Sequence, residues 1–277
     1  MLAIMYKLRQ LAGCKQVFEH RCNSSNGAVS FTQLQRSLKP DPIYDTYQKG
    51  VVIKNKIQKI KEICTWNVQE LWWHSYRGNK LDNIIKYISN STSDVLCLQE
   101  VFEPKVIRLL TTHPAISRHF PYYLTGNLCN SYILGENSGL LVLSRYPIIF
   151  REFIPFKISA FPDTFASKGA LFFTIGEINF ITTHLQSINI PVALRQLYHI
   201  IKNSPFKGKT ILLGDLNIPD PFPFLKMQRN NQGHTHLSGC TLDHIIPLHS
   251  DIDFGVEVDY INLKNTSDHY PLIATLR

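Results

Sequence analysis

The chain has 277 residues, 44% of them apolar, and it carries 29 Lys and Arg side chains against 21 Asp and Glu. The aromatic content of 11% and the mixed charges exclude a chain that is disordered throughout. No stretch of about 18 or more residues is free of charged side chains, so no membrane-spanning helix is expected.

The first sixty residues hold most of the net charge of +8. They contain ten basic and three acidic side chains, whereas residues 61–277 contain 19 basic and 18 acidic ones. A basic excess is typical of proteins that bind nucleic acid or anionic membranes, but here it belongs to an N-terminal segment. We therefore predict a basic arm at residues 1–59, partly disordered, in front of a catalytic domain at 60–277.

The N-terminus and the cysteines bear on the cellular compartment. Residues 1–13 lack the long apolar run of a secretory signal, and no acid precedes Glu19, which leaves a mitochondrial presequence as an alternative to a leading helix. The six cysteines form no Cys-x-x-Cys pair, and Cys64 and Cys97 lie within apolar runs. These features favour a reducing compartment, so we expect an intracellular, cytoplasmic protein.

From residue 60 onward, short apolar runs alternate with helical patterns. Apolar residues recur at i, i+3, i+4 and i+7 within 79–91 and again within 190–202, which predicts two amphipathic helices. The runs that predict strands are, in chain order, 60–66, 94–99, 139–144, 170–175, 178–185, 210–216, 240–247, 256–263 and 270–276. The alternation indicates an α/β domain built on two sheets.

Polar side chains stand at the ends of these apolar runs, where an unpaired buried charge would cost several kcal/mol. Each one alone fits a helix cap or a turn, but together they indicate one site: Asn67, Glu100, His184, Asp215, Asn217, Asp243, Asp268 and His269. Carboxylates and amides suit a hard cation such as Mg²⁺, and histidines near it can act as general base or phosphate donor. These residue types favour phosphoester hydrolysis by an activated water.

Six short motifs resemble the successive signatures of the endonuclease/exonuclease/phosphatase superfamily, the DNase-I-like phosphoesterases. They are TWNVQ at 65–69, LQEV at 98–101, THLQS at 183–187, GDLN at 214–217, LDHI at 242–245 and SDHYPL at 267–272. The resemblance runs from about residue 61 to 277 and keeps the order of the family. It implies an α/β four-layer sandwich, in which two mixed β-sheets pack face to face with helices outside.

The resemblance also implies roles for individual residues. Glu100 would be the principal ligand of Mg²⁺, for which Mn²⁺ can substitute, with Asn67 as a second ligand and Asp268 as support. His269 would be the general base, oriented by Asp243, which agrees with the behaviour of an imidazole held by a carboxylate.

Three further residues would act on the phosphate. His184 would donate to a phosphate oxygen, while Asp215 and Asn217 would position the attacking water and the scissile phosphate. How Asp215 and His269 divide the work stays open.

The stretch from Asp163 to Gly169 indicates a branch of the family. Its Asp163 and Lys168 are five residues apart, a spacing that resembles the neutral sphingomyelinases. Lys168 would supply positive charge to a phosphodiester oxygen, and Asp163 would restrain it in a resting state. The simpler reading is a surface turn with a solvated ion pair worth about 0–1 kcal/mol.

Several alternatives remain at this point. A phospholipid is the favoured substrate, with peripheral membrane contact through Trp72–Trp73 or the aromatic residues of 219–224. A DNase-I-like nuclease is the first alternative, although the balanced charge of 61–277 offers no basic track for a nucleic acid. A catalytically inactive binding module on the same fold is the second. His234, His236 and Cys240 hint at a zinc site, but a flexible rim explains them better, and the sequence does not indicate an oligomeric state.

Overall fold

The computed structural model describes residues 59–70, 79–126, 137–227, 233–248 and 252–277. The predicted arm at 1–59, apart from its last residue, lies outside the described residues, as does the predicted contact at Trp72–Trp73. Within the described parts of the chain, no helix is long and apolar enough to cross a membrane.

The first sheet has six strands and pairs the first described strand of the chain with the last one. In chain order the strands are β1 (Glu62–Glu70), β2 (Val95–Val101), β3 (Tyr122–Thr125), β4 (Leu141–Ser144), β10 (Phe254–Val258) and β11 (Leu272–Leu276). Their order across the sheet is β10-β11-β1-β2-β4-β3. Only β1 and β2 run parallel, and β11 pairs with β1 in the antiparallel direction.

The second sheet has five strands in a simple order. They are β5 (Phe150–Pro155), β6 (Gly169–Ile175), β7 (Ile178–His184), β8 (Thr210–Asp215) and β9 (Asp243–Pro247), and they lie side by side in that order. β7 and β8 run parallel, whereas the other neighbours are antiparallel. The parallel pair matters for the site described below because the carboxyl ends of β7 and β8 lie side by side at the same end of the sheet.

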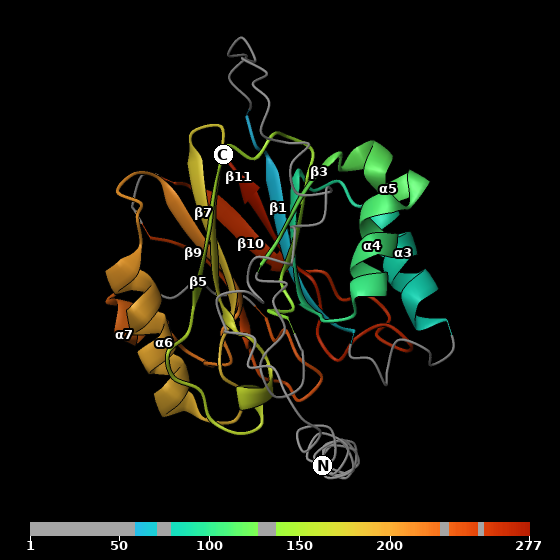
Figure 1. Cartoon of the computed structure of the whole chain (residues 1–277). Helices are drawn as coiled ribbons and strands as arrows, with labels where there is room; N and C mark the ends of the chain where they lie inside the picture. Colours follow the sequence, from blue (N-terminus) through green and yellow to red (C-terminus); the bar gives the residue numbers. More distant parts are fainter. Residues whose placement is uncertain (1–58, 71–78, 127–136, 228–232, 249–251) are drawn as a thin grey trace, which may run out of the picture. The chain divides into compact units, whose positions relative to one another are not determined.

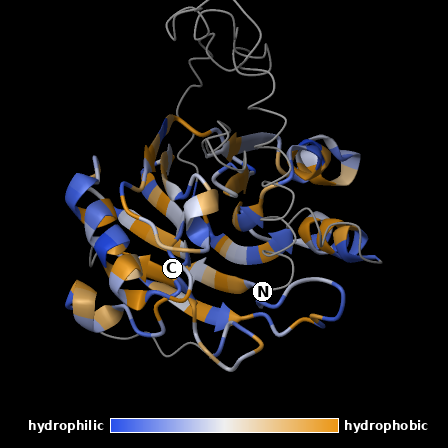
Figure 2. Ribbon diagram, turned by 60° about the horizontal axis from the view of Figure 1, so that its bottom comes forward, coloured by the Kyte–Doolittle hydropathy of each residue, from blue (hydrophilic) through white to orange (hydrophobic). Residues whose placement is uncertain are grey.

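The two sheets and the two groups of helices form four layers, and an apolar cluster fills each of the three spaces between them. One cluster fills the space between the two sheets, with members such as Val142, Phe173 and Leu213. The second packs the first sheet against α3 (Lys80–Asn90), α4 (Pro104–Thr112) and α5 (Pro114–His119), and the third packs the second sheet against α6 (Ile190–Asn203) and α7 (Phe222–Leu225). Figure 1 shows the two groups of helices on opposite sides of the strands. Along the strands, hydrophobic residues alternate with paler or hydrophilic ones (Figure 2).

The predicted sandwich of two mixed sheets flanked by helices is confirmed, with corrections at some elements. The strand predicted at 256–263 is wrong in its second half, because β10 ends at Val258. Val258 pairs with Leu272 of β11, and the next residue of the partner is Pro271, which has no N–H to continue the ladder. β1 and β2 extend further than predicted, so Asn67 and Glu100 lie within strands. The elements β3, β5, α4, α5 and α7 and a short 3-10 helix at Asp163–Phe165 were not predicted.

Candidate active site

Three polar side chains form a row across the ends of neighbouring strands of the second sheet. His184 ends β7 and Asp215 ends β8, and the parallel register pairs these two residues directly. Asp243 begins β9 and pairs with Asp215 from the other side. All three residues are buried. The strand order alone therefore brings together residues that are up to 59 positions apart in the chain.

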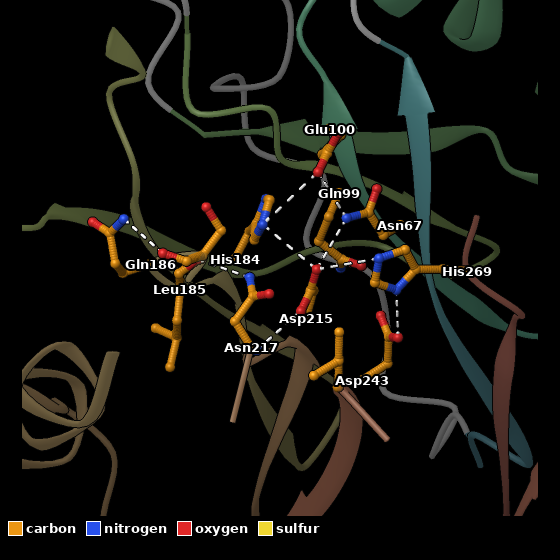
Figure 3. Close-up of polar contacts among 12 residues, drawn as sticks. Asn67, Gln99, Glu100, His184, Leu185, Gln186, Asp215, Asn217, Asp243 and His269 are labelled. Atoms are coloured by element: carbon orange, nitrogen blue, oxygen red, sulfur yellow. Dashed lines mark hydrogen bonds and ion pairs between the residues drawn. The ribbon is translucent and has the colours of Figure 1, made fainter. Parts of the chain in front are cut away.

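The first sheet contributes Asn67 and Glu100 from its parallel strands β1 and β2. The Asn67 amide Nδ2 donates to Glu100 Oε1 at 3.0 Å and to Asp215 Oδ2 at 3.0 Å, which links the two sheets (Figure 3). The register of β1 and β2 shifts between Asn67 and Glu70, and Glu100 has a positive φ of 59°. Such irregularities re-aim side chains away from the regular pleat and are common beside active sites.

His269 lies just before β11 and points at the row of carboxylates (Figure 3). Its Nδ1 is 2.7 Å from Asp243 Oδ2, and its Nε2 is 3.7 Å from Asp215 Oδ2. Its backbone is held in place because its N–H donates to Ser267 Oγ, and Trp66 Nε1 donates to its carbonyl. Burial lowers the pKa of His269, but the carboxylates of Asp243 and Asp215 more than offset this and raise the pKa to about 10.

Burial also shifts the pKa of the other groups at the centre. It raises the pKa of Asp215 to about 7, against the opposing effect of His269, and it raises the pKa of Glu100. Burial and the nearby Lys168 ammonium hold the pKa of His184 well below 6.5. Carboxylates whose charged form is disfavoured in this way gain from a nearby cation.

The donor set fits a hard divalent cation such as Mg²⁺. It consists of carboxylate oxygens from Glu100 and Asp215, with the Asn67 amide between them, and such ligands suit Mg²⁺. Asn67 presents its nitrogen to both carboxylates, while its Oδ1 accepts from the Gln69 N–H. As a metal ligand it would have to rotate its amide so that oxygen faces the ion.

Asp163 and Lys168 form an ion pair in which Lys168 is buried and Asp163 is partly buried, rather than a solvated surface turn. Lys168 Nζ is 2.9 Å from Asp163 Oδ2 and 3.1 Å from His184 Nε2, and it donates to the Leu185 carbonyl at 3.0 Å. Asp163 in turn accepts from the Ser187 N–H at 2.6 Å. The pair therefore touches the row of polar residues directly.

Asn217 and Asp268 lie on two sides of this centre. Asn217 Nδ2 donates to the Leu185 carbonyl, and its backbone N–H donates to Asp215 Oδ1. Asp268 accepts from Gln69 Nε2 at 2.7 Å. Its carboxylate also lies 3.6 Å from His236 Nε2 and 3.9 Å from His269 Nε2. All ten residues proposed from the sequence thus lie in one connected network.

The sequence did not indicate several members of this network. Gln69 contacts Asp268, and the buried Lys80 donates to the Gln69 carbonyl at 2.6 Å while lying 3.7 Å from Glu70. Thr235 Oγ1 accepts the backbone N–H of Asp243. Of these, only Gln69 had a sequence signal, since it stands inside the TWNVQ motif.

Comparisons with known proteins agree with the observed fold. The sequence profile of the "Endonuclease/Exonuclease/phosphatase family" matches residues 64–269. A protein of Dictyostelium discoideum, "Sphingomyelinase DDB_G0288017", is 28% identical over an aligned region that covers 45% of this chain. The aligned region spans 37% of the length of that curated relative.

Two solved structures have similar folds. Sphingomyelinase C from Streptomyces griseocarneus has a TM-score of 0.64 at 18% identity, covering 79% of this chain and 100% of its own. A beta toxin mutant from Staphylococcus aureus, solved with bound magnesium ions, has a TM-score of 0.65 at 19% identity, covering 79% of this chain and 100% of its own. At such identities the likeness shows the fold alone.

Proposed function

Because the chain belongs to the endonuclease/exonuclease/phosphatase family, we propose that it is a Mg²⁺-dependent phosphodiesterase whose His269 activates the attacking water. The observation that carries this proposal is the contact of 2.7 Å between His269 Nδ1 and Asp243, beside the carboxylates of Asp215 and Glu100. A carboxylate-oriented imidazole next to a cation site contains the parts needed to hydrolyse a phosphodiester.

Glu100 and Asn67 would hold the metal ion, with Asp268 in support. When bound, Mg²⁺ or its substitute Mn²⁺ neutralises negative charge on the phosphate oxygens. The buried carboxylates support this assignment because burial raises the pKa of Glu100 and Asp215 and so makes a cation favourable there.

His269 would act as the general base. His269 would keep the proton on Nδ1, which donates to Asp243. Its Nε2 would then take the proton of the water. Without a cation, the carboxylates of Asp243 and Asp215 keep a second proton on the ring. His269 loses this proton more readily when positive charge offsets those carboxylates, so the base and the cation site work together.

Lys168 and His184 would contact the non-bridging phosphate oxygens, and Asp215 and Asn217 would position the water and the scissile group. In the structure Asp163 holds the Lys168 ammonium at 2.9 Å, against His184. A phosphodiester that enters the site would compete with Asp163 for this ammonium. Asp163 would thus restrain Lys168 in the resting state.

We infer that the substrate is sphingomyelin or a related phospholipid. The spacing of Asp163 and Lys168, and their burial beside His184, support this class together with the distant relative named as a sphingomyelinase. A nucleic-acid substrate would need basic side chains along a phosphate track, whereas residues 61–277 carry 19 basic and 18 acidic side chains.

Two loops beside the active site would form the contact with a lipid surface. They expose Ile158, Phe161 and Ile188, which we call the apolar rim; Phe161 is 59% exposed and Ile188 is 88% exposed. The loops are tied together because Gln186 Oε1 accepts the Ala160 N–H, and Asp163 accepts the Ser187 N–H. Ile188 has a positive φ of 65°, which is costly for a β-branched residue.

The aromatic residues at 219–224 are less suited to this contact. Phe222 is buried in the cluster under the second sheet, so only Phe224 of the two is exposed. The apolar rim therefore replaces this segment in our proposal for the membrane contact.

One assay tests the proposed activity. The full chain is incubated with Mg²⁺ and choline-headgroup sphingolipid vesicles, plasmid DNA or a soluble chromogenic phosphodiester. We expect hydrolysis of the lipid, loss of Mg²⁺ stimulation in Glu100→Gln, and a rate reduced by 10²-fold or more in His269→Ala, on the order of the contribution of a general base. Glu257→Gln, an exposed change on β10, is the matched control and should leave the rate unchanged.

Other results would reject parts of the proposal. Cleavage of DNA without hydrolysis of lipid would overturn the substrate class and favour a nuclease. Absence of metal-dependent activity on all three substrates would favour an inactive binding module. Persistence of metal dependence in Glu100→Gln would overturn the assignment of the metal ligand.

A further inference from the structure

His236, Asp268 and His269, which we call the imidazole cluster, lie together at the mouth of the candidate active site. His236 and His269 face each other across an isolated antiparallel bridge, and their ring centroids are 4.7 Å apart. Their Nε2 atoms lie 3.6 Å and 3.9 Å from the carboxylate oxygens of Asp268. One nitrogen from each ring and one carboxylate oxygen all lie within 4.8 Å of one another.

Both imidazoles are oriented through their other nitrogen. His269 Nδ1 is 2.7 Å from Asp243 Oδ2, and His236 Nδ1 is 2.7 Å from Ser238 Oγ. Partners of this kind fix the ring angle of metal-binding histidines. His236 Nδ1 also accepts the Ser238 N–H at 3.1 Å, so the proton of the neutral His236 ring lies on Nε2 before any ion binds. Gln69 Nε2 donates to Asp268 Oδ2 and holds the carboxylate in the same way.

The backbone also holds the cluster together. The Leu237 N–H donates to the Asp268 carbonyl at 2.9 Å, and the Tyr270 N–H donates to the Thr235 carbonyl at 2.8 Å. An ion can reach the site from solvent, because the side chains of His236 and Asp268 are 23% and 33% exposed, although that of His269 is only 7% exposed. The backbone therefore holds the three residues near one another, and solvent reaches the site.

The donors of the imidazole cluster differ from those around Glu100. Two imidazole nitrogens and one carboxylate suit a borderline ion such as Zn²⁺, which takes bonds of about 2.0–2.2 Å to such ligands in a tetrahedral site. That geometry separates the ligand atoms by about 3.3 Å, so three atoms that now lie within 4.8 Å of one another would move closer by up to about 1.5 Å when the ion binds. Mg²⁺ prefers oxygen ligands and would not select this site.

We propose that His236, Asp268 and His269 form a second metal site for Zn²⁺ or a similar borderline ion, which inhibits the enzyme by occupying Nε2 of its general base. Each imidazole would bind through Nε2. His269 would release its Nε2 proton to solvent and keep the proton on Nδ1 against Asp243, whereas His236 would shift its proton from Nε2 to Nδ1, which can then donate to Ser238 Oγ. A lone pair that is bound to the ion cannot accept a proton from water. The inhibitory effect rests on the proposed function, whereas the binding of the ion does not.

A binding experiment tests the site without any assay of activity. The full chain is freed of metal and supplied with excess Mg²⁺, and Zn²⁺ is then titrated by calorimetry, with the visible absorption of Co²⁺ as a spectroscopic check. We expect His236→Ala to weaken one Zn²⁺ site at least tenfold and to remove the Co²⁺ signal. The matched control is His234→Ala, which changes a neighbouring exposed imidazole outside the cluster and should bind like the wild type.

Activity then tests inhibition. The His236→Ala variant should keep the Mg²⁺-dependent rate of the wild type and need at least tenfold more Zn²⁺ for half inhibition. Equal Zn²⁺ affinity in the wild type and His236→Ala would overturn the site, and equal inhibition of the two would overturn the mechanism of inhibition. If the protein hydrolyses no diester, the proposed function fails, while loss of Zn²⁺ binding in His236→Ala alone still supports the site.

Discussion

His269 is both the general base of the proposed hydrolysis and a ligand of the proposed Zn²⁺ site, and its pKa depends on three nearby carboxylates. Asp243 lies 2.7 Å from Nδ1, while Asp215 and Asp268 lie 3.7 Å and 3.9 Å from Nε2. Burial alone would keep this imidazole neutral, but the neighbouring carboxylates raise its pKa to about 10. Without a cation, the residue is therefore an acid at neutral pH, and added positive charge turns it into a base.

Replacing Asp243 with Asn should lower the pKa of His269 in the metal-free protein. The substitution removes the largest effect that raises the pKa, and burial, which lowers it, remains. NMR of the imidazole nitrogens during a pH titration measures the change directly. Asp268→Asn is the control and should lower the pKa less, because its carboxylate has a smaller effect on His269.

The raised pKa of His269 also makes the stability of the fold depend on pH. A histidine whose folded pKa is raised stabilises the fold fully below the unfolded pKa of 6.5 and loses this contribution as the pH rises through about 10. Urea unfolding between pH 6 and pH 10 should show a steeper loss of stability for the wild type than for Asp243→Asn. An unchanged His269 titration in Asp243→Asn would contradict the assignment of Asp243 as its orienting partner.

At the scale of elements, the loop before β6 and the loop after β7 act as one unit. The contacts of Asp163 with Ser187 and of Ala160 with Gln186 join them, and buried Gln196 of α6 donates to the Ile158 carbonyl. The unit carries the apolar rim on its outside and the Lys168 ammonium on its inside. A surface that contacts the rim could therefore influence the restraint on Lys168.

The double substitution Phe161→Ser and Ile188→Ser should separate lipid binding from chemistry. Burying each apolar side chain in a lipid surface contributes about 1.5–3 kcal/mol, so its loss should reduce vesicle binding and hydrolysis by tenfold or more. The rate on a soluble phosphodiester should change less than twofold, because neither side chain reaches the reacting groups. Vesicle sedimentation and parallel rate measurements give both quantities.

Ile149→Ser is the matched control for this pair. Ile149 is also strongly exposed, but it precedes β5 at the end of the sheet away from Lys168, as the pairing of Pro155 with Gly169 shows. Its substitution should leave hydrolysis of vesicles unchanged. Equal rates on vesicles for the wild type and the rim variant would remove the rim from the proposal.

The parts of the site that lie at strand ends could be predicted from the sequence. His184, Asp215 and Asp243 each follow or begin an apolar run, and neighbouring strands bring such positions to one edge. The periodicity of the amphipathic helices α3 and α6 was equally clear. The weaker signals belong to β3, with four residues, and to β5, which is largely exposed and carries no clean alternation.

The parts of the site that depend on distant loops could not be predicted. The burial of Lys168 depends on Asp163 and Leu185, and no local pattern distinguishes a buried ion pair from a solvated one. Gln69 finds its partner Asp268 almost two hundred residues away. His236 joins His269 only through the pairing of a loop with the segment before β11. The sequence grouped His236 with His234 and Cys240 as a possible zinc site, and this grouping did not include His269.

At the scale of the whole folded region, the candidate site lies across the interface between the two sheets. Asn67 of the first sheet binds Asp215 of the second, and His269 beside β11 binds Asp243 of β9. Ligands that hold Glu100, Asn67 and their neighbours together therefore favour the packed arrangement of the sheets over the unfolded chain.

Magnesium should raise the stability of the folded protein. At a Mg²⁺ concentration 100 times its dissociation constant, binding contributes about 2.7 kcal/mol, and a domain of this size gains roughly 2–4 °C in Tm per 1 kcal/mol. Thermal unfolding followed by near-ultraviolet circular dichroism, with and without a chelator, measures the shift. Glu100→Gln should show no shift, and a shift of the same size in this variant would place the ion elsewhere.

The pairing of β1 with β11 has a consequence for the order of synthesis. A ribosome makes Trp66 about two hundred residues before the His269 carbonyl to which its indole donates. Until β11 emerges, β1 is an open edge in a partly formed sheet, a template on which other chains can add. In that interval the nascent chain therefore exposes a strand edge, and the candidate site lacks His269.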